Sequence, residues 1–556
     1  MKKQGFFRTI IFVVMLAVLN NAVMAQSKNL YVGDWEGKFM GDFTAIIKLY
    51  IDEQGDVNGN ILMYAGDNQI QNDHLSKISL VDDQLTFFIP AKETQFEGSF
   101  NEEKVKLSGD FVFPDGSKHP ITVFKPDSNQ NVPPSTSESC LELKQKKYSQ
   151  EELKDDLNFL MNKLLESHPQ PYFFTSKISM DNLVKHALKN IHDDMTLQEF
   201  FIEISPIVEA VKCSHTGLRL PMNHHITFTE MEQSFPLKLV IRGTKAYFLS
   251  ALCKERIDIL PGSEITSING TQVDEILKQL FMFISVEGNN TSTKYNELNR
   301  HFNKYLQLLF DSEIYVIEYS ALGEKQSIKV KGIESNTFNS DVIGALPLDF
   351  FLDSDSNVGF IKIRAFEFDD INTYIQQSDS IFKTLKEENI GNLVLDLRDN
   401  SGGHPIFAAQ LFSYLIDHDF TYFKQNSNVP EFAPLYQPMQ PSQFRVCGNI
   451  FVLVNGGSLS TTGHLISLIK YHTDAIFIGE EPGSTFYCCD NSMQLALPNT
   501  GIEANIPRSI FETAVSGFDR NQPFPLDYRL DISIEKLVAG RDDYMDFVIN
   551  LIRENN

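Results

Sequence analysis

Short stretches of apolar or alternating residues fill the chain from Asn29 to about Pro126. They read FTAIIKLYI, NGNILMYA, QLTFFIP and KVKLSGDFVF, and they are separated by Gly, Asp and Asn. A period of two is typical of β-strands with one buried face. We therefore predict a small antiparallel β-barrel or sandwich, with Trp35 in its core.

The polar segment DSNQNVPPSTSES ends this pattern, and its composition is typical of an interdomain linker. Helical spacing follows. Ser149 with Glu152, and Thr196 with Glu199, fit the capping box that begins a helix. One apolar stripe is formed by Leu153, Leu157, Leu160 and Leu164. We predict a helical region here.

Strand patterns then return in LKLVIRG and KAYFLSAL. The stretch ILPGSEITSINGTQVDEILKQL comes next, and IYVIEYSALGEKQSIKVKGI predicts a hairpin that turns at Gly323. The order of a Gly turn, a strand, Ile-Asn-Gly and a helix resembles a PDZ domain, although Ser263 stands where that pattern prefers Asp. The alternative is an unrelated β-rich insert.

From Asn357 onward, strands alternate with helices. VGFIKIRAF precedes a helix over about 370–388, and NLVLDLRDNSGG, NIFVLVNGG and DAIFIGEEPGS contain further apolar strands. Helical patterns begin near Phe407 and Thr461. This alternation predicts a buried parallel sheet, with any catalytic residues at the carboxyl ends of its strands.

A chain of 556 residues is longer than the ~250 to 300 residues that one hydrophobic core usually holds. We therefore expect a multidomain α/β protein. Its expected segments are a signal peptide (1–25), an all-β barrel or sandwich domain (26–125), a linker (126–147), a helical subdomain (148–225), a PDZ-like β-rich unit (226–345) and an α/β core (346–556).

The amino terminus predicts export. Lys2, Lys3 and Arg8 flank the apolar run TIIFVVMLAVL, and AVMA provides small residues before a cleavage site near Ala25. The run is short for a membrane span, and no Cys follows it as a lipoprotein would require. We expect a periplasmic or extracellular protein without a stable membrane span.

Composition narrows the function. A net charge of −25 argues against a nucleic-acid partner, whose phosphates need clustered Lys and Arg. The six cysteines are few for this length, and no His or Cys spacing indicates a metal site, so we expect neither a disulfide framework nor a cofactor. We expect Cys213 to be a small buried residue.

Two loops of small residues follow predicted strands. DLRDNSGG contains Gly402 and Gly403, which allow backbone N–H groups to face a cleft. NGGSLSTTG places Ser460 at a helix N-terminus, where free amides stabilise an anion. The alternative role for Ser460 is helix capping, for which Ser458, Thr461 and Thr462 compete. No Gly-x-Ser-x-Gly elbow is centred on Ser460, so an α/β-hydrolase is disfavoured.

The order of NLVLDLRDNSGG, VLVNGGSLSTTGHLISLIKYHTDAIFIGEEPGS and PFPLDYRLDISIEKLVAGRDDYMDFVINLI resembles the core of the C-terminal processing peptidases, a serine peptidase family that includes tail-specific and tricorn-core proteases. The resemblance covers roughly residue 148 to the carboxyl end. It implies a ββα-spiral, crotonase-like core. It also implies that Ser460 is the nucleophile, and that Gly402, Gly403 and the Thr461 amide form the oxyanion hole.

One branch of the family uses a lysine base, but GEEPGSTFYCCD contains no lysine. The resemblance is therefore to the tricorn-like branch, which implies His215 as the general base and Ser214 as the residue that orients it. An imidazole suits this task because its pKa lies near neutral pH. The acid that completes the relay is expected between Ile510 and Gln522. The first candidates are Glu512 and Asp519, and Glu480 is the next.

These observations predict an exported serine endopeptidase that cleaves extended peptides or unfolded protein through an acyl-enzyme on Ser460. The alternative is a catalytically inactive peptide- or ligand-binding protein on the same scaffold. The sequence specifies neither the natural substrate nor the oligomeric state.

Overall fold

A computed structural model of the protein describes residues 31–125 with gaps at 40–42, 52–56, 66–67, 82, 93, 102–103, 105 and 114–117. It also describes residues 146–221, residues 233–334 except 254, 255 and 311, and residues 347–555 except 369 and 426–428. The predicted signal peptide and most of the predicted linker lie outside the described residues. The chain divides into two compact units, residues 1–136 and 137–556.

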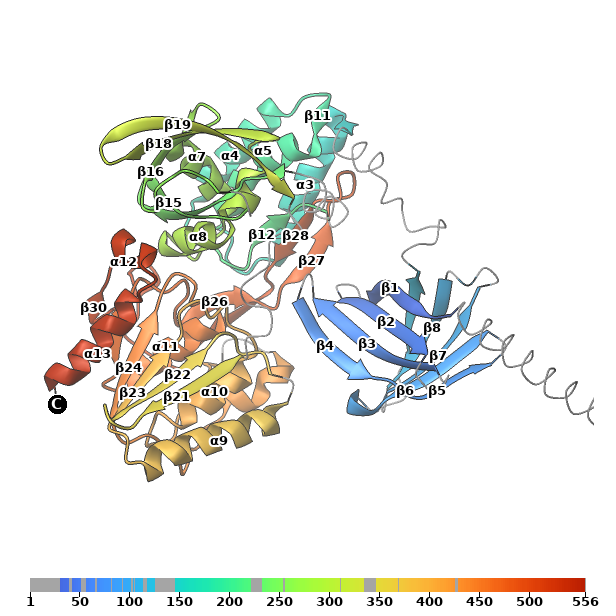
Figure 1. The fold of residues 1–556 in the computed structure, drawn as a ribbon. Helices are drawn as coiled ribbons and strands as arrows, with labels where there is room; N and C mark the ends of the chain where they lie inside the picture. Colours follow the sequence, from blue (N-terminus) through green and yellow to red (C-terminus); the bar gives the residue numbers. More distant parts are fainter. Residues whose placement is uncertain are drawn as a thin grey trace, which may run out of the picture. The chain divides into compact units, whose positions relative to one another are not determined.

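The first unit contains one nine-stranded sheet in the order β4-β3-β2-β1-β9-β8-β7-β6-β5. Its strands are β1 (Gly33–Phe39), β2 (Phe43–Ile51), β3 (Val57–Ala65), β4 (Asn68–His74), β5 (Ser76–Val81), β6 (Gln84–Ile89), β7 (Thr94–Phe100), β8 (Lys106–Val112) and β9 (Lys118–Phe124). The sheet curls until β5 contacts β3 (Figure 1). Alternate residues of β7 are buried and exposed, and Trp35 is fully buried. The prediction for Trp35 is confirmed.

The second unit begins with three helices, α3 (Gln150–Ser167), α4 (Lys177–Asn190) and α5 (Leu197–Glu209). Both predicted capping boxes are present, at Ser149 for α3 and at Thr196 for α5. The four leucines of the predicted stripe are buried. These side chains belong to the same hydrophobic cluster as the α/β sheet, so the helical region shares its core with the sheet.

A β-rich part with its own hydrophobic cluster follows. Its antiparallel sheet contains β14 (Leu237–Arg242), β15 (Lys245–Ala251), β16 (Glu264–Ile268), β17 (Thr271–Gln272), β18 (Ile314–Ala321) and β19 (Glu324–Lys331), and its helices are α7 (Val273–Leu280) and α8 (Ser292–Leu306). β18 and β19 form the expected hairpin. Leu322 and Gly323 make its turn, with φ values of 51° and 85°, as a two-residue turn requires.

The α/β sheet has the order β21-β22-β23-β24-β25-β30. Its strands are β21 (Leu348–Asp353), β22 (Val358–Ile363), β23 (Asn392–Asp396), β24 (Asn449–Val454), β25 (Ile476–Gly479) and β30 (Tyr528–Arg529). All neighbours are parallel except β21 and β22. Every residue of β23 is buried, as expected for a central parallel strand.

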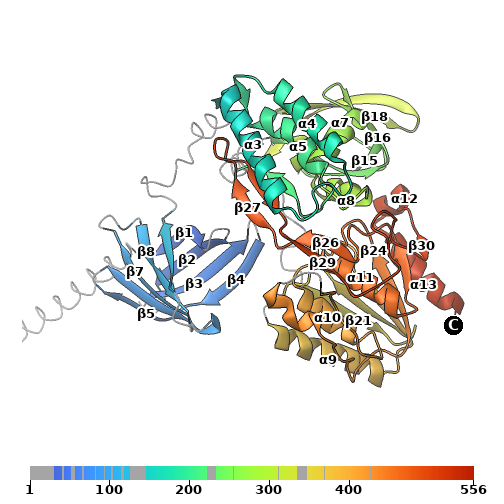
Figure 2. The ribbon, with the colours of Figure 1, turned by 180° about the vertical axis from the view of Figure 1, so that it is seen from behind.

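Helices cover both faces of this sheet (Figures 1 and 2). One face packs in a common cluster with α9 (Ile371–Glu387), α10 (Pro405–Ser413) and α11 (Thr461–His472), and the other packs against α13 (Asp543–Asn555). The three helices of the first face each connect consecutive parallel strands. The carboxyl ends of these strands therefore lie at one edge of the sheet.

A two-stranded ribbon leaves the α/β core and reaches the helical region. Its strands are β27 (Met493–Ala496) and β28 (Glu503–Ile506), and β28 pairs with β12 (Gly217–Arg219). Gly217 lies opposite Asn505. A second ribbon pairs β26 (Tyr487–Asp490) with β29 (Ser509–Glu512). The first ribbon brings the segment that contains His215 to the α/β core.

The smaller elements complete the described secondary structure. They are β10 (Lys147–Tyr148), β11 (Met195–Thr196), β13 (Gln233–Ser234), β20 (Ile333–Glu334), α12 (Ile534–Val538) and the 3₁₀ helices η1 (Pro90–Lys92), η2 (Phe281–Phe283) and η4 (Pro430–Tyr436). None of the helices in the described part of the chain is both long and apolar enough to cross a bilayer.

Candidate active site

Ser460 lies where the chain passes from β24 into α11. Its backbone has φ 52° and ψ −122°, the conformation of the first central residue of a type II′ turn, where Gly is usual. Such a backbone costs about 1–3 kcal/mol and is found mainly at functional sites. The Ser460 side chain makes no capping hydrogen bond to α11. The alternative role of Ser460 as a helix cap is therefore wrong.

The side chain of Ser460 instead meets His215. The distance from His215 Nε2 to Ser460 Oγ is 3.1 Å, between residues 245 positions apart. Ser214 Oγ lies 3.3 Å from His215 Nδ1 on the other side of the ring. With a proton on Nδ1, the imidazole donates to Ser214 and accepts from Ser460. This is the geometry that a general base requires.

Backbone contacts hold the His215 loop in place. The Thr216 N–H donates to the Cys213 carbonyl at 3.0 Å, and Asn505 Nδ2 donates to the His215 carbonyl at 2.6 Å. The second bond depends on β28, because Asn505 belongs to that strand. The ribbon thus positions the imidazole above the N-terminus of α11.

A carboxylate that was not among the sequence candidates also reaches the imidazole. Asp490, the last residue of β26, places Oδ2 3.5 Å from His215 Nε2. Its other oxygen accepts a hydrogen bond from Ser492 at 3.1 Å. Asp490 therefore lies on the nucleophile's side of the ring and not at Nδ1.

Gly402 lies directly against Ser460, and Gly403 lies against the backbone of Phe366. Gly402 has φ 101°, and a Cβ atom there would stand 2.8 Å from the Cβ atom of Ser460. The Gly402 N–H donates to Asn400 Oδ1 at 3.0 Å. Among the described residues, no acceptor bonds the amides of Gly403 and Thr461. These two amides are free to stabilise an oxyanion, whereas the Gly402 amide is occupied.

Asn400 and Ser458 tie the two loops together. Asn400 is fully buried, and its side-chain Nδ2 donates to the Ile363 carbonyl at 3.0 Å. Its backbone carbonyl accepts a hydrogen bond from the Leu459 N–H at 2.9 Å. The Ser458 hydroxyl donates to the Leu397 carbonyl at 2.8 Å. Ser458 is thus a structural residue of the turn.

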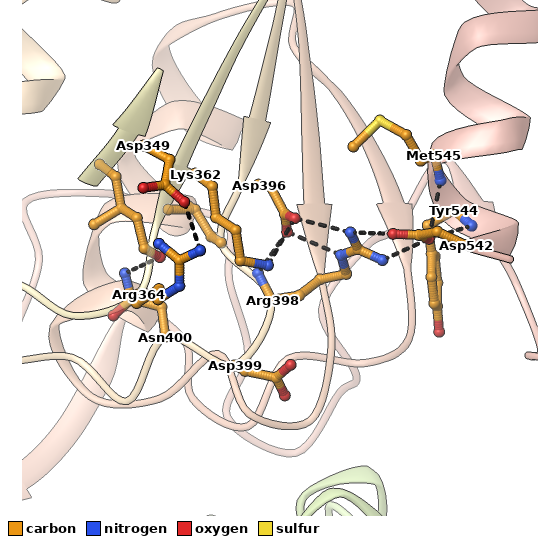
Figure 3. Close-up of polar contacts among 12 residues, drawn as sticks. Asp349, Lys362, Arg364, Asp396, Arg398, Asp399, Asn400, Asp542, Tyr544 and Met545 are labelled. Carbon is orange, nitrogen blue, oxygen red and sulfur yellow. Dashed lines mark hydrogen bonds and ion pairs between the residues drawn. The ribbon is translucent and has the colours of Figure 1, made fainter. Parts of the chain in front are cut away.

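A charged cluster fixes the start of the glycine loop (Figure 3). Arg398 forms hydrogen bonds to both oxygens of Asp396, at 2.9 and 2.8 Å, and to both oxygens of Asp542, at 2.8 and 2.7 Å. Lys362 adds a contact of 3.0 Å to Asp396. Burial opposes ionisation of Asp396, but the contacts with Arg398 and Lys362 outweigh it and lower the pKa of the carboxyl. The cluster therefore stays charged at neutral pH.

The same cluster reaches the C-terminal helix. The Asp542 carboxylate accepts from the N–H groups of Tyr544 and Met545, at 3.0 and 3.1 Å, at the start of α13 (Figure 3). Arg398 also lies 5.0 Å from the centre of the Tyr544 ring. The loop that carries Gly402 and Gly403 is in this way anchored to α13.

The three acids expected from the sequence contact other groups. Glu512 forms an ion pair with Lys424 at 2.5 Å, and Glu480 lies 3.3 Å from Arg242. Asp519 is exposed and accepts from the Asn521 N–H at 2.9 Å. In the described structure, Asp490 is the carboxylate within ion-pair distance of His215.

A second histidine lies behind the nucleophile. His464, in the first turn of α11, is buried, and its Nε2 is 3.3 Å from the Sγ of Cys488. Burial and the nearby charge of His215 lower the pKa of His464 to about 3. His464 is therefore neutral at physiological pH. Cys213 is buried, as expected.

No group of three or more His, Cys, Asp or Glu side chains within the described residues is arranged to hold a metal ion. The arrangement supports nucleophilic chemistry by a serine and an imidazole.

Residues 357–502, which include both glycines and Ser460, match the model of peptidase family S41. This part of the chain thus carries the core of a peptidase of family S41. It is a serine-type peptidase. No curated protein matches the chain.

Two solved structures of CPAF share the fold of this chain. Mature CPAF is 14% identical with a TM-score of 0.53, and the match covers 73% of this chain and 97% of that one. Mature CPAF complexed with lactacystin is 14% identical with a TM-score of 0.54, and the match covers 73% of this chain and 99% of that one. The photosystem II D1 C-terminal processing protease is 14% identical with a TM-score of 0.37, covering 69% and 93%.

Proposed function

We propose that this protein is an exported serine endopeptidase that cleaves extended peptides or unfolded protein through an acyl-enzyme on Ser460. The observation that carries the proposal is the 3.1 Å contact between His215 Nε2 and the hydroxyl of a serine with a strained backbone. A structural serine has no need of this conformation.

The chemistry has two halves. As Ser460 Oγ attacks the scissile carbonyl, His215 Nε2 takes its proton, and the resulting imidazolium then gives that proton to the leaving amine. Water, deprotonated by the same nitrogen, hydrolyses the acyl-enzyme. Ser214, 3.3 Å from Nδ1, holds the ring so that Nε2 faces the nucleophile. The Asp490 carboxylate supports the imidazolium, because it lies 3.5 Å from Nε2.

The oxyanion of the tetrahedral intermediate is placed at the amides of Gly403 and Thr461. Gly402 has a different task. Without a side chain it lets the loop approach Ser460, and its own amide is held by Asn400. The hydrogen bond from the Thr461 hydroxyl to the Gly403 carbonyl, 2.5 Å long, joins the two donor segments.

The remaining parts of the proposal, on export, cofactors and domains, rest on the sequence. Residues 1–25 direct export, the mature protein acts in the periplasm or outside the cell, and no cofactor takes part. The β-rich part serves as a PDZ-like unit that binds peptide, the residues after 346 form a crotonase-like core, and the domain boundaries are those of the sequence. The alternative, an inactive binding protein on the same scaffold, is disfavoured by the contact between His215 and Ser460.

The test is covalent labelling of the purified protein with a serine-directed phosphonate, followed by mass mapping. We expect a single modified residue, Ser460, and no labelling of Ser460→Ala. Wild type and Ser460→Ala should then both be assayed on an unstructured peptide. A protein that hydrolyses the peptide but is labelled elsewhere contradicts the assignment of Ser460. A protein that is neither labelled nor active favours the binding alternative.

A further inference from the structure

The two amides that we assign to the oxyanion belong to different loops. Gly403 lies in the loop after β23, and Thr461 follows the turn after β24. An oxyanion is stabilised only when its donors lie about 2.7–3.1 Å from the position of the oxygen. The spacing between the two loops is therefore a condition for catalysis.

A clasp of three side chains, those of Asp399, Asn455 and Asn296, joins these loops. Asp399 lies in the first loop, with its carboxylate apart from the cluster around Arg398 (Figure 3), and Asn455 directly follows β24. The Asp399 N–H donates to Asn455 Oδ1 at 2.9 Å, and Asn455 Nδ2 donates to Asp399 Oδ1 at 3.0 Å. Each residue donates to the other, so both the distance and the orientation between the loops are restrained.

The third member of the clasp comes from the β-rich part. Asn296, near the start of α8, donates from Nδ2 to the same Asp399 oxygen at 2.7 Å, across 103 positions of the chain. Its own oxygen faces the other loop, because a Cβ atom on Gly457 would stand 2.8 Å from Asn296 Oδ1. Asn296 therefore lies against both loops at once.

The start of α8 is itself held against the α/β core. The Ser292 hydroxyl donates to the Glu481 carbonyl at 2.5 Å. A Cβ atom on Gly456 would approach the Ser292 carbonyl oxygen to 2.2 Å, so the two backbones are in direct contact. Asn296 thus reaches the clasp from a fixed support.

Hydrogen bonds connect the clasp to the residues that precede both donor amides. Asn455 Oδ1 also accepts from the Gly457 N–H at 3.0 Å, and the Asn455 N–H donates to Ser458 Oγ at 3.2 Å. On the other loop, Asn400 follows Asp399 in the chain and accepts from the Gly402 N–H. A shift of the clasp is therefore passed on toward Gly403 and Thr461.

The clasp lies at the surface. Asp399 is exposed and Asn296 is half-buried. Water competes for such hydrogen bonds, so each one contributes little to the free energy of unfolding. A misplacement of a catalytic group by about 1 Å, in contrast, can lower the rate by about 100-fold. Loss of Asn296 should therefore affect catalysis far more than stability.

We infer that Asn296 is a positioning residue that sets, through Asp399, the spacing between the Gly403 and Thr461 amides. The β-rich part in this way contributes a side chain to the support of the oxyanion site. The role rests on the proposed peptidase function. Asn296 acts indirectly, because its hydrogen bond goes to Asp399 and not to Ser460 or His215.

The test compares Asn296→Ala with wild type on an unstructured peptide. We expect kcat to fall by about 10-fold to 100-fold and KM to change by less than about threefold, because the oxyanion forms only in the transition state. The midpoint of thermal unfolding should stay the same. If kcat stays within about threefold of wild type, or if the variant does not fold, the inference is overturned.

Asn303→Ala is the matched control. Asn303 lies on the same helix, and its side chain has no hydrogen-bond partner in the part of the chain that the structure describes. The variant removes the same side chain without touching the clasp, so it should behave as wild type.

An exchange of the two partners makes the test specific. Asn296→Asp faces Asp399 with a second carboxylate, so its kcat should fall below that of Asn296→Ala. Adding Asp399→Asn to Asn296→Asp restores one donor and one acceptor, and kcat should rise by at least about fivefold over Asn296→Asp alone. A double variant without this recovery contradicts the inference.

Hydrogen exchange followed by mass spectrometry needs no substrate, so it separates this inference from the proposed function. In Asn296→Ala, the amides of residues 399–403 and 455–461 should exchange faster than in wild type, while β23 keeps its protection. If the protein proves to be no peptidase, faster exchange still supports the clasp. Unchanged exchange in both loops overturns it.

Discussion

Replacing Ser460 by glycine should make the protein more stable than replacing it by alanine. Both variants lose the hydroxyl and its hydrogen bond to His215, so they differ only in the Cβ atom. At φ 52° and ψ −122°, alanine keeps the strain of the native backbone, whereas glycine adopts this conformation freely.

The strain amounts to about 1–3 kcal/mol. Against this, glycine loses about 0.5–1 kcal/mol more than alanine through the entropy of the unfolded chain. The net expectation is that Ser460→Gly exceeds Ser460→Ala in the free energy of unfolding by about 1 kcal/mol, within a range of about 0–2.5 kcal/mol. At Ser380, an exposed position within helix α9, the same pair should show the opposite order, with glycine about 1 kcal/mol worse.

The assay is denaturant unfolding followed by far-UV circular dichroism. Fluorescence of Trp35, the single tryptophan, reports on the unit of residues 1–136, which does not contain Ser460, and it should not change between the variants. The reasoning is refuted if Ser460→Gly is the less stable of the pair by the margin seen at Ser380. In that case the backbone at Ser460 stores no strain.

Four other outcomes are expected. His215→Gln should lower the rate of peptide hydrolysis by on the order of a millionfold at every pH. In wild type, kcat/KM should fall at acid pH. A substantial remaining rate in the variant would indicate another base. Arg398→Met should lower the free energy of unfolding by about 3 kcal/mol, because buried Asp396 keeps Lys362 and the N–H of residue 398 but loses the guanidinium, and a loss below about 1 kcal/mol would contradict this. Burial raises the pKa of Glu287, so this carboxyl contributes stability that is complete below its ordinary pKa and is lost as pH rises through about 7. Between pH 4.5 and pH 8, the free energy of unfolding of Glu287→Gln should therefore fall by about 3 kcal/mol less than that of wild type. Equal losses would contradict burial of the charge. A protein truncated to begin near Cys140 should hydrolyse an unstructured peptide at close to the full-length rate, and a folded but inactive product would place the first unit in the catalytic machinery.

Features that depend on neighbours in the chain could be predicted from the sequence. The capping boxes at Ser149 and Thr196 and the hairpin at Gly323 are present because each is made by residues a few positions apart. The alternating burial of β7 and the complete burial of β23 likewise follow from periodicity. The match of residues 357–502 to family S41 confirms the resemblance that the two glycine-rich loops suggested.

The contacts around Ser460 required the tertiary structure. His215 reaches the nucleophile because β12 pairs with β28, and this pairing joins segments almost 300 residues apart. The occupied amide of Gly402 depends on how Asn400 is buried. Neither arrangement leaves a periodic or local pattern, because each arises from packing between distant segments.

The acids show this limit most clearly. Glu512 and Asp519 were reasonable candidates by their place in the chain, yet their side chains meet Lys424 and Asn521. Asp490 lies beside His215 through the pairing of β26 with β29. Sequence determined which residue types the chemistry needs. The tertiary structure decided which carboxylate stands beside the imidazole, because electrostatic interactions depend on distance in space and not on separation along the chain.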